Sequence, residues 1–572
     1  MEYSAIFHDM DKRFCYAIDK DLFVIRVQVK KDDMKEVILH YEDKYIPIER
    51  KDTRMTLPMK KVATSQFHDY YEAQLQMHLI CLRYFFEFTD MQGEKVYYGN
   101  YEFDKECITN RDRMFDCPQN LREEEMFEVP EWAANKVVYQ IFPSRFAATE
   151  PVDKELWYKA PITPMDDLHG NLRGIIEHMD DIQNLGIDVL YMTPIFQSNS
   201  CHKYDTTDYY QIDPSFGTTE DLKELVQKAH ERGMKVVLDA VYNHTGREFF
   251  AFADILENGE KSKYRDWYFI DGFPLKSEWG EIPNFKCFGY YGGMPKLNLK
   301  NPEVEKYITD VACYWIKECD IDGWRLDVGD EISHFFWKNF RKAVKAVKKD
   351  MLIIGEIWHY AGDFLEGDEW DTVMNYPFYL NLIDLLADEK ITVSQFVQNL
   401  GYLKGRLHKN CYPLMWNLID SHDTARFLHL CNDNKKKQHL AAAFQLLLPG
   451  MPMIYYGDEY AMPGANDPDC RRGMYWDEEY QDKEMYEWYK RLIQVRKSHA
   501  CIVEGELAGS VTEDEEGTVV LIRKNGEETI AMIFNCSSSA KKFNEYTQKY
   551  NLLTENTFDG NVEGFDAAVI VL

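Results

Sequence analysis

Eight short apolar runs, each of the length of a β-strand, alternate with helical segments between residues 137 and 459. Residues 218–233, for example, have apolar side chains at helical spacing, with Thr218 or Thr219 able to cap the start and Gly233 the end. Eight strands alternating with helices favour a closed (β/α)8 barrel over an open sheet, with catalytic residues at the carboxyl ends of the strands. The runs are VVYQIF (137–142), DVLYMTP (188–194), KVVLDAVYNH (235–244), DGWRLDV (322–328), MLIIGEIW (351–358), TVMNY (372–376), MWNLIDSHD (415–423) and PMIYYGDE (452–459).

Three of these runs contain a carboxylate where the apolar stretch ends, namely Asp327, Glu356 and Asp423. Arg325 precedes Asp327 by two residues, and alternation along a strand places both on one face. A cation at that spacing is expected to keep the carboxylate ionised near neutral pH. Cleavage of an acetal needs an ionised nucleophile, a protonated acid and negative charge near the developing oxocarbenium ion. Three carboxylates, with His422 beside the last, match these requirements.

The composition argues against several classes of partner. The chain of 572 residues has a formal net charge of −31, whereas nucleic acids and anionic membranes favour basic proteins. A neutral polar substrate is compatible with this charge. Aromatic residues make up 14% of the chain, so stacking platforms for sugars are possible, although core packing accounts for most of these rings.

The cysteines and the N-terminus predict a cytoplasmic protein. The thirteen cysteines are scattered and include no CxxC pair, which indicates reduced thiols rather than a disulfide framework or a zinc site. The first residues contain no apolar signal-peptide core, and no run of about 18 apolar residues occurs that could cross a membrane.

The parts of the chain outside the eight runs predict two further domains. Residues 1–120 alternate apolar and polar positions, as in FVIRVQV, and are expected to form a β-sandwich followed by a charged, proline-containing linker. Residues 121–498 are predicted to form the barrel. The segment from about 243 to 298 lacks the alternation of strands and helices, which indicates a subdomain inserted after the third strand. Residues 499–572 return to short alternating strands and predict a C-terminal all-β domain, a second β-sandwich. The expected fold class is α/β, a TIM barrel flanked by these two domains.

Four motifs resemble those of the α-amylase family of retaining glycoside hydrolases (glycoside hydrolase family 13). They are DAVYNH (239–244), GWRLDV (323–328), GEIWH (355–359) and SHD (421–423). Three further segments resemble the neopullulanase, cyclomaltodextrinase and maltogenic amylase group within it, namely HKYDTTDYYQIDPSFG (202–217), MPKLN (294–298) and NDPDCRRGMYWD (466–477). The N-terminal FHDYYEAQL (67–75) and LRYFFEFTDMQGEKVYYG (82–99) are similar to the starch-binding-type module of that group.

The resemblance implies a role for each carboxylate. Asp327 would be the nucleophile, Glu356 the general acid/base, and Asp423 the third carboxylate that binds sugar hydroxyls and supports the transition state. A retaining mechanism needs the first two about 5 Å apart, and neighbouring barrel strands allow this. A negative Asp423 nearby would raise the pKa of Glu356 and keep it protonated.

The resemblance also implies substrate contacts. His244 and His422 would hydrogen-bond the sugar at the cleaved bond, Tyr204 would stack beneath it, and Arg325 would accompany the nucleophile. Asp467 and Arg471 would bind the next sugar, with a surface ion pair as the alternative. Trp358, Glu331, Phe288 and Tyr290 would shape the acceptor side, with ordinary packing as the alternative. The full set is Tyr204, His244, Arg325, His422, Trp358, Glu331, Asp467, Arg471, Phe288 and Tyr290.

The chain departs from the group at two places. The group often has a calcium loop rich in Asn and Asp after its first strand, but in FPSRFAATEPVD (142–153) Asp153 is the only such residue. Calcium takes six to eight oxygen ligands, so we expect no required cofactor and no metal ligands, with calcium doubtful. Asn243 could serve a different ion site or none. Cys201 replaces an Asn that is common before HKYD.

The leading hypothesis is hydrolysis of α-1,4-glucosidic bonds in maltooligosaccharides, cyclomaltodextrins or pullulan. A 4-α-glucanotransferase on the same site and a non-catalytic glucan-binding protein are alternatives. A metal-dependent hydrolase would need an HxH or HExxH motif, which the chain lacks. The resemblance also implies a homodimer in which the N-terminal module covers the partner's active-site cleft. Tyr45 and Ile46, apolar residues in the charged segment EDKYIPIER (42–50), would suit such an interface. The alternative is that this module binds polymeric starch or aids stability.

Overall fold

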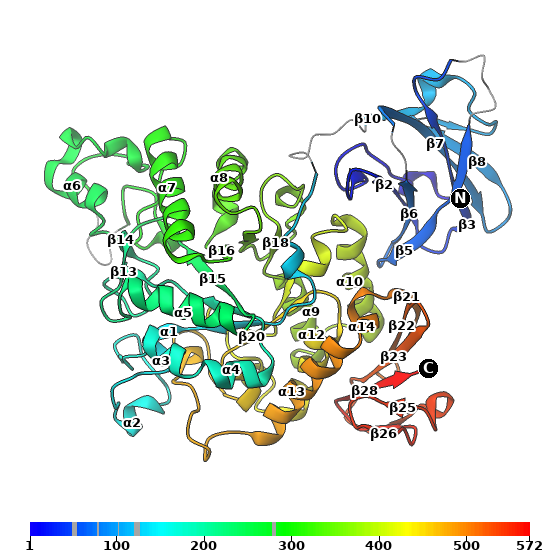
Figure 1. The fold of residues 1–572 in the computed structure, drawn as a ribbon. Helices are drawn as coiled ribbons and strands as arrows, with labels where there is room; N and C mark the ends of the chain where they lie inside the picture. Colours follow the sequence, from blue (N-terminus) through cyan, green and yellow to red (C-terminus); the bar gives the residue numbers. More distant parts are fainter. Residues whose placement is uncertain (48–53, 77–78, 101, 119–125, 277–281) are drawn as a thin grey trace. The chain divides into compact units, whose positions relative to one another are not determined.

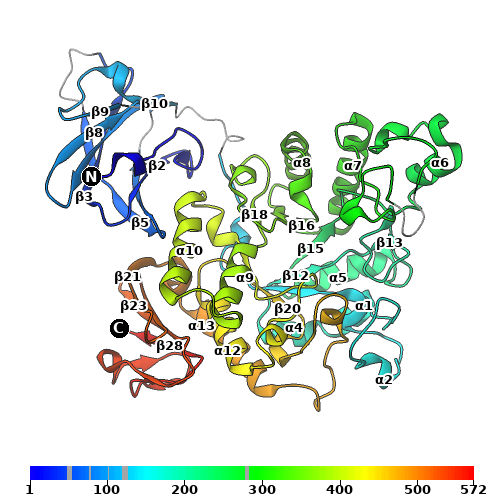
Figure 2. The ribbon, with the colours of Figure 1, turned by 180° about the vertical axis from the view of Figure 1, so that it is seen from behind.

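The computed structural model describes residues 1–47, 54–76, 79–100, 102–118, 126–276 and 282–572 (Figures 1 and 2). The chain divides into two compact units. The first contains residues 1–129, 361–371 and 391–412, and the second contains the remainder. Within the described ranges, no helix is both long enough and apolar enough to cross a membrane.

Two antiparallel sheets form a β-sandwich in the first unit, as predicted for the N-terminal residues. Ile25, Val27, Leu39 and Phe86 are among the fully buried side chains of its core. One sheet has the order β1 (Cys15–Ala17), β2 (Leu22–Lys30), β6 (His68–Gln76), β5 (Lys60–Thr64). The other has the order β4 (Met55–Pro58), β3 (Met34–Asp43), β7 (Cys81–Asp90), β8 (Lys95–Gly99), β9 (Glu102–Asp104), with β10 (Phe115–Pro118) beside β7.

Helix α10 (Val393–Arg406) also belongs to the first unit and packs on β5. It approaches so closely that a Cβ added to Gly401 would lie 1.9 Å from the carbonyl oxygen of Thr64. Arg26 of β2 is 2% exposed and donates to the carbonyl oxygens of Gly405 (3.0 Å) and Leu407 (2.9 Å). The alternation in FVIRVQV predicts a polar outer face at Arg26, but residues 391–412 bury it.

The second unit contains the predicted barrel. Eight parallel strands follow the order β18, β17, β16, β15, β12, β11, β20, β19. A parallel bridge between Met374, next to β18, and Trp416 of β19 connects the two ends of this order. Seven of the strands lie within their predicted runs, and β20 begins one residue before its run. The eight strands are β11 (Val138–Ile141), β12 (Val189–Met192), β15 (Lys235–Ala240), β16 (Gly323–Leu326), β17 (Leu352–Gly355), β18 (Thr372–Val373), β19 (Trp416–Asn417) and β20 (Met451–Tyr455).

Helices follow the strands, and their caps agree with the sequence. Thr218 and Asp221 form a capping box at the start of α5, which packs on β15. Helix α12 packs on β20. The helices of this unit are α1 (Pro143–Phe146), α2 (Lys154–Trp157), α3 (Leu172–Glu177), α4 (Met179–Leu185), α5 (Thr219–Glu231), α6 (Phe250–Asn258), α7 (Pro302–Cys319), α8 (His334–Val347), α9 (Tyr376–Leu382), α11 (Phe427–Leu430), α12 (Lys435–Leu447), α13 (Lys483–Ser498) and α14 (Cys501–Glu504).

The segment after β15 leaves the barrel and returns to it. It contains α6 and closes through isolated antiparallel bridges, one of which pairs His244 with Lys296. A hairpin of β13 (Phe196–Ser198) and β14 (Thr206–Ile212) follows β12. The C-terminal residues form the predicted all-β domain. Its main sheet has the order β21 (Glu506–Glu513), β22 (Thr518–Asn525), β23 (Glu528–Asn535), β28 (Asp566–Val571), β25 (Tyr550–Asn551), β26 (Asn556–Thr557), beside the pair β24 (Lys541–Lys542) and β27 (Asn561–Val562).

Gly401→Ala is expected to destabilise the first unit. In an isolated helix the change would stabilise by about 1 kcal/mol. Here the new methyl group would meet the backbone of Thr64, and overpacking typically costs about 1–3 kcal/mol. Urea denaturation of the full chain measures the change, with Gly272→Ala as the control because a Cβ there meets nothing within 4 Å. A Gly401→Ala protein as stable as the wild type would contradict this packing.

Candidate active site

Arg325 lies at the centre of the site, where its fully buried guanidinium contacts four carboxylates. Its Nη1 lies 3.0 Å from Asp327 Oδ1 and 3.1 Å from both oxygens of Asp239, and its Nη2 lies 2.9 Å from Glu356 Oε2. Asp423 Oδ2 is 3.8 Å from Nη2. The three predicted carboxylates are therefore brought together around Arg325. Asp239 is a fourth that sequence reasoning missed, although it ends an apolar run in the same way.

Parallel pairing explains why Asp327 and Glu356 lie side by side. Leu326 of β16 is in register with Gly355 of β17, so the next residue of each strand emerges at the same edge. Glu356 Oε2 accepts a hydrogen bond of 2.9 Å from the backbone N–H of Val328. Asp327 Oδ2 is buried and finds no hydrogen-bond partner among the described residues. This oxygen is therefore not engaged by another group of the described site.

Burial raises the pKa values of all four carboxyls. For Asp327 the pKa is well above the ordinary range, because burial and repulsion from Glu356 outweigh the attraction of Arg325. The lowering of the Asp327 pKa that is expected from Arg325 is therefore outweighed by burial and by Glu356. The pKa of Glu356 is also raised, first by burial and further by Asp423, which confirms the expected influence of Asp423. Burial raises the pKa of Asp239 to about 6.

His422 is held in one tautomer. Gln140 Nε2 donates to its Nδ1 at 2.7 Å, so the proton lies on Nε2, which is 3.1 Å from Asp423 Oδ2. Burial, with Arg471 and Arg325, lowers the pKa of His422 well below its usual value, so the ring is neutral. Gln140, on the first barrel strand, carried no signal in the sequence beyond its place in an apolar run.

Tyr204 contacts both Asp239 and His422. Its hydroxyl donates to Asp239 Oδ2 at 3.0 Å, and its ring lies parallel to that of His422 with centroids 5.5 Å apart. His244 Nε2 donates to the Tyr204 carbonyl at 3.1 Å, and the His244 ring stacks on Phe288. Tyr290 follows in the same turn and is 92% exposed.

Of the predicted acceptor residues, Trp358 lies beside Glu356, and Glu331 lies beside Asn243 and Lys296. Trp358 stacks on Tyr376 with centroids 4.0 Å apart, and its indole Nε1 lies 3.3 Å from Glu356 Oε1. Glu331 Oε2 accepts from Lys296 Nζ at 3.1 Å and from Asn243 Nδ2 at 3.2 Å. Lys296 Nζ also donates to Asn243 Oδ1 and to the Glu331 carbonyl. The Lys296 ammonium thus lies among oxygens, a role that the motif MPKLN did not reveal.

Asp467 and Arg471 form an ion pair of 2.7 Å. Arg471 is only 9% exposed and also donates to the carbonyl oxygen of His422 at 2.8 Å. The pair therefore adjoins His422 and Asp423 rather than lying apart on the surface.

The part of the chain that the structure describes contains no cluster of three or more His, Cys, Asp or Glu side chains suited to a metal ion. Asp153 lies in the segment 142–153, which corresponds to the calcium loop of the group. It caps α2 by accepting a hydrogen bond from the backbone N–H of Glu155.

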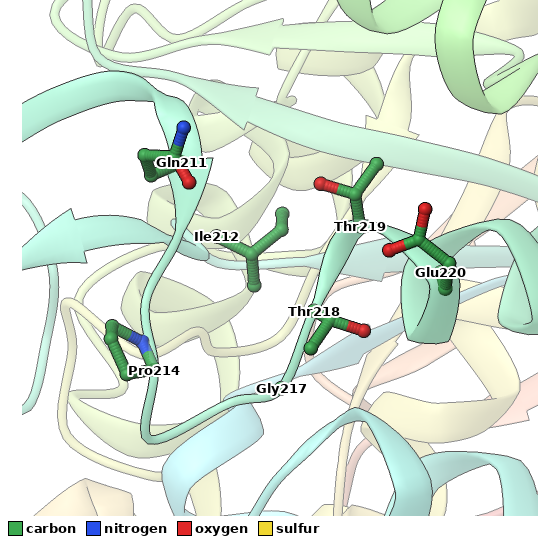
Figure 3. A pocket seen from close by; sticks show the side chains of 7 residues that line it. All are labelled: Gln211, Ile212, Pro214, Gly217, Thr218, Thr219 and Glu220. Carbon is green, nitrogen blue, oxygen red and sulfur yellow. The ribbon is translucent and has the colours of Figure 1, made fainter.

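A separate hollow of about 420 Å³ lies between β14 and the start of α5, as Figure 3 shows. None of the four carboxylates lines it. Its lining residues are Gln211, Ile212, Pro214, Gly217, Thr218, Thr219 and Glu220.

Comparisons with known proteins cover nearly the whole chain. The family model described as "Alpha amylase, catalytic domain" matches residues 140–480, and "Alpha amylase, N-terminal ig-like domain" matches residues 1–119. A cyclomaltodextrinase of Geobacillus thermopakistaniensis (strain MAS1) is 42% identical over 544 residues, 94% of this chain and 92% of that one. An intracellular maltogenic amylase of Bacillus subtilis is 38% identical over 543 residues, 94% of this chain and 91% of that one. A solved cyclomaltodextrinase structure has a TM-score of 0.94 at 37% identity and covers 100% of both chains.

His244 is expected to make stability fall in acid. Burial and Lys296 lower its pKa from 6.5 to about 3. Between these values the unfolded chain binds a proton that the folded chain does not, so the free energy of unfolding decreases as the pH falls below the unfolded pKa. The slope for one residue is about 1.4 kcal/mol per pH unit at most. Urea denaturation at several pH values should therefore find that His244→Gln loses less stability than the wild type between neutral pH and pH about 5. If the difference in free energy of unfolding between His244→Gln and the wild type did not change with pH, the lowered pKa of His244 would be contradicted.

Proposed function

This chain belongs to the α-amylase family, and we propose that it is a retaining glycoside hydrolase of α-1,4-glucosidic bonds in maltooligosaccharides, cyclomaltodextrins and pullulan. The observation that carries the proposal is the contact of one buried guanidinium, Arg325, with both Asp327 and Glu356 on neighbouring strands. That arrangement supplies a nucleophile and an acid that can flank one glycosidic bond. The names of the similar proteins, cyclomaltodextrinase and maltogenic amylase, support the choice of substrates.

In the first step, Glu356 gives its proton to the glycosidic oxygen while Asp327 Oδ2 attacks the anomeric carbon. The bond to the leaving sugar breaks, and a glycosyl-enzyme ester forms on Asp327. In the second step, Glu356 takes a proton from water, and the resulting hydroxide displaces Asp327 from the sugar. The acid is restored, and the anomeric configuration is retained after two inversions.

The raised pKa values of Glu356 and Asp327 are compatible with an acid and a nucleophile, because the two carboxyls exchange protons as a pair. Glu356 and Asp327 contact the same guanidinium and repel each other, so their protons are released in steps that belong to the pair. A sugar that accepts a hydrogen bond from Glu356 favours the proton on that residue, which leaves Asp327 ionised beside Arg325. Asp423 and Asp239 add negative charge near the developing oxocarbenium ion.

The remaining predicted residues are proposed to bind sugar. His422 can direct its Nε2–H to a sugar hydroxyl, whereas His244 donates its one N–H to the Tyr204 carbonyl and can only accept from a hydroxyl at Nδ1. Tyr204 offers a ring beside the cleaved bond. Asp467 and Arg471 are proposed to hold the next sugar through their ion pair beside His422.

Transfer to a sugar acceptor is the second candidate function. Trp358 is 42% exposed, stacks on Tyr376 and lies beside Glu356, so it offers a flat apolar surface where an acceptor sugar would stand. Phe288, Glu331 and exposed Tyr290 are proposed to extend this acceptor side. An acceptor sugar bound there would compete with water for the glycosyl-enzyme.

We also propose a cytoplasmic homodimer, with residues 1–120, 121–498 and 499–572 as its domains. The printed name of the intracellular relative supports the location. Tyr45, which is 66% exposed, supports an interface at the N-terminal module. Residues 48–50 of the proposed contact segment lie outside the described residues.

Asp327→Asn is expected to lower kcat by several orders of magnitude, because an amide of the same shape cannot attack the anomeric carbon. Sugar released from β-cyclodextrin, pullulan and soluble starch measures the loss, and circular dichroism checks the fold. Asp330→Asn, three residues further on and with an exposed side chain, is the matched control and should retain turnover. If Asp327→Asn kept a tenth of the wild-type kcat, Asp327 would not be the nucleophile.

Tyr45→Asp in the full chain is expected to give a monomer with a lower ratio of cyclodextrin to starch activity. A charge at an apolar contact would oppose association. Sedimentation measures the assembly. Phe67→Asp is the control, because Phe67 is equally exposed in the same module at 66%. Point variants are preferred to deletion of residues 1–120, since that deletion would also uncover α10. A wild-type protein that sediments as a monomer would rule out the dimer and leave the catalytic proposal intact.

A further inference from the structure

Two thiols meet in the core of the N-terminal sandwich, far along the chain from the active-site motifs. Cys15 and Cys117 are each 5% exposed, and their Sγ atoms lie 2.9 Å apart. Cys15 is on β1 of one sheet, and Cys117 is on β10, which pairs with β7 of the other sheet. The two sulfurs therefore meet between the two sheets. The catalytic proposal uses neither of them.

The separation is close to that of a bonded pair. A disulfide bond is about 2.05 Å long, so each sulfur would move by roughly half an ångström to form it. The scattered cysteines predict reduced thiols, and nothing in their spacing singles out positions 15 and 117. The other cysteines of the module differ in setting: Cys107 is exposed, and Cys81 directs its Sγ toward the Leu82 carbonyl.

A hydrogen-bonded chain leads away from Cys15. His8 Nδ1 lies 2.7 Å from the carbonyl oxygen of Arg26, an acceptor, so this nitrogen carries the proton. His8 Nε2 must then accept, and it does so from the Tyr84 hydroxyl at 2.7 Å. The Tyr84 oxygen is left as an acceptor for the Cys15 thiol, 3.7 Å away. When Cys15 ionises, the Tyr84 hydroxyl can turn from His8 and donate to the thiolate instead.

Burial keeps this group in its neutral form at rest. It raises the pKa of Cys15 well above its ordinary value, and the neighbouring Cys117 raises it further. It lowers the pKa of His8 to about 4, so His8 is a neutral acceptor at physiological pH. The Cys15 thiol is therefore slow to ionise, and a hydrogen bond from Tyr84 to its thiolate would favour that step.

We propose that Cys15 and Cys117 form a reversible disulfide that locks the two sheets of the N-terminal sandwich together under oxidising conditions. With hydrogen peroxide as oxidant, one thiolate attacks the peroxide, the O–O bond breaks, and a sulfenic acid and water form. The second thiol attacks that sulfur, the S–O bond breaks, and a second water leaves. Two thiols thus lose two electrons to one peroxide, giving one disulfide and two waters. A dithiol reductant reverses the bond by exchange.

The disulfide would cross-link most of the N-terminal sandwich. It would close a loop from residue 15 to residue 117, which includes the strands of both sheets. Closing a loop of that length restricts the unfolded chain and so favours the folded state. The oxidised protein should therefore resist unfolding of this unit more than the reduced protein does.

The test uses the full chain treated with hydrogen peroxide or with a dithiol reductant. Mass spectrometry after thiol alkylation and proteolysis should find a peptide pair linked through Cys15 and Cys117 only after oxidation, and the reductant should remove it. Thermal unfolding should show a rise of several degrees in the transition of the oxidised protein. Cys81→Ser is the matched control, as a buried cysteine of the same module, and should still form the link. Cys15→Ser and Cys117→Ser should each abolish both the link and the shift.

Tyr84→Phe separates the hydrogen bond to the thiolate from the packing, because it keeps the ring and removes the hydroxyl. It should slow formation of the linked peptide several-fold without preventing it. Oxidised wild-type protein with Cys15 and Cys117 still alkylatable, or linked to other cysteines instead, would overturn the proposal. So would a linked protein whose unfolding is unchanged, since the bond would then not stabilise the sandwich. An unchanged rate in Tyr84→Phe would show that the Tyr84 hydroxyl takes no part in forming the bond.

Discussion

The burial of one cation among four carboxylates is the interaction on which the rest of the site depends. Arg325 is fully enclosed, and its guanidinium contacts Asp239, Asp327 and Glu356 directly. A buried charge without partners costs several kcal/mol, and removal of one partner leaves the other uncompensated. The buried carboxylates likewise depend on Arg325, because without it their negative charges would be uncompensated. Their combined charge exceeds that of one guanidinium, so the cluster holds protons that exposed carboxyls would release.

The barrel provides this arrangement through its register. Asp239, Asp327 and Glu356 end three consecutive strands, β15, β16 and β17, whose pairing brings their carboxyl ends to one edge. No long side chain has to reach across the barrel, because each acid stands where its strand stops. Asp423 and His422 arrive from the segment after β19, where Gln140 of β11 fixes the tautomer of His422. The geometry therefore depends on strand pairing, which packing stabilises, more than on any flexible loop.

The N-terminal sandwich and the barrel sequence are interleaved along the chain. After β18 and α9, residues 391–412 contribute α10 to the first compact unit before β19 begins. Glycines at 401 and 405 allow that helix to lie directly against Thr64 and Tyr70. Arg26, buried in a strand of the sandwich, donates to the carbonyl oxygens that follow the helix. The first compact unit therefore contains residues 1–129 together with two later segments, 361–371 and 391–412.

The sequence by itself determined the barrel, the three acids and the two flanking β-domains. Strand–helix alternation is a local pattern, and an acid at the end of an apolar run is visible without coordinates. Only the tertiary structure decided that Asp239 joins the acids, that Lys296 lies among the oxygens of Asn243 and Glu331, and that Cys15 meets Cys117. Each of these depends on contacts between residues distant in the chain, which periodicity does not encode. The pKa of Asp327 shows the same division. An arginine two residues away predicts a lowered value, but the burial and the repulsion that raise it come from strands that only folding brings together.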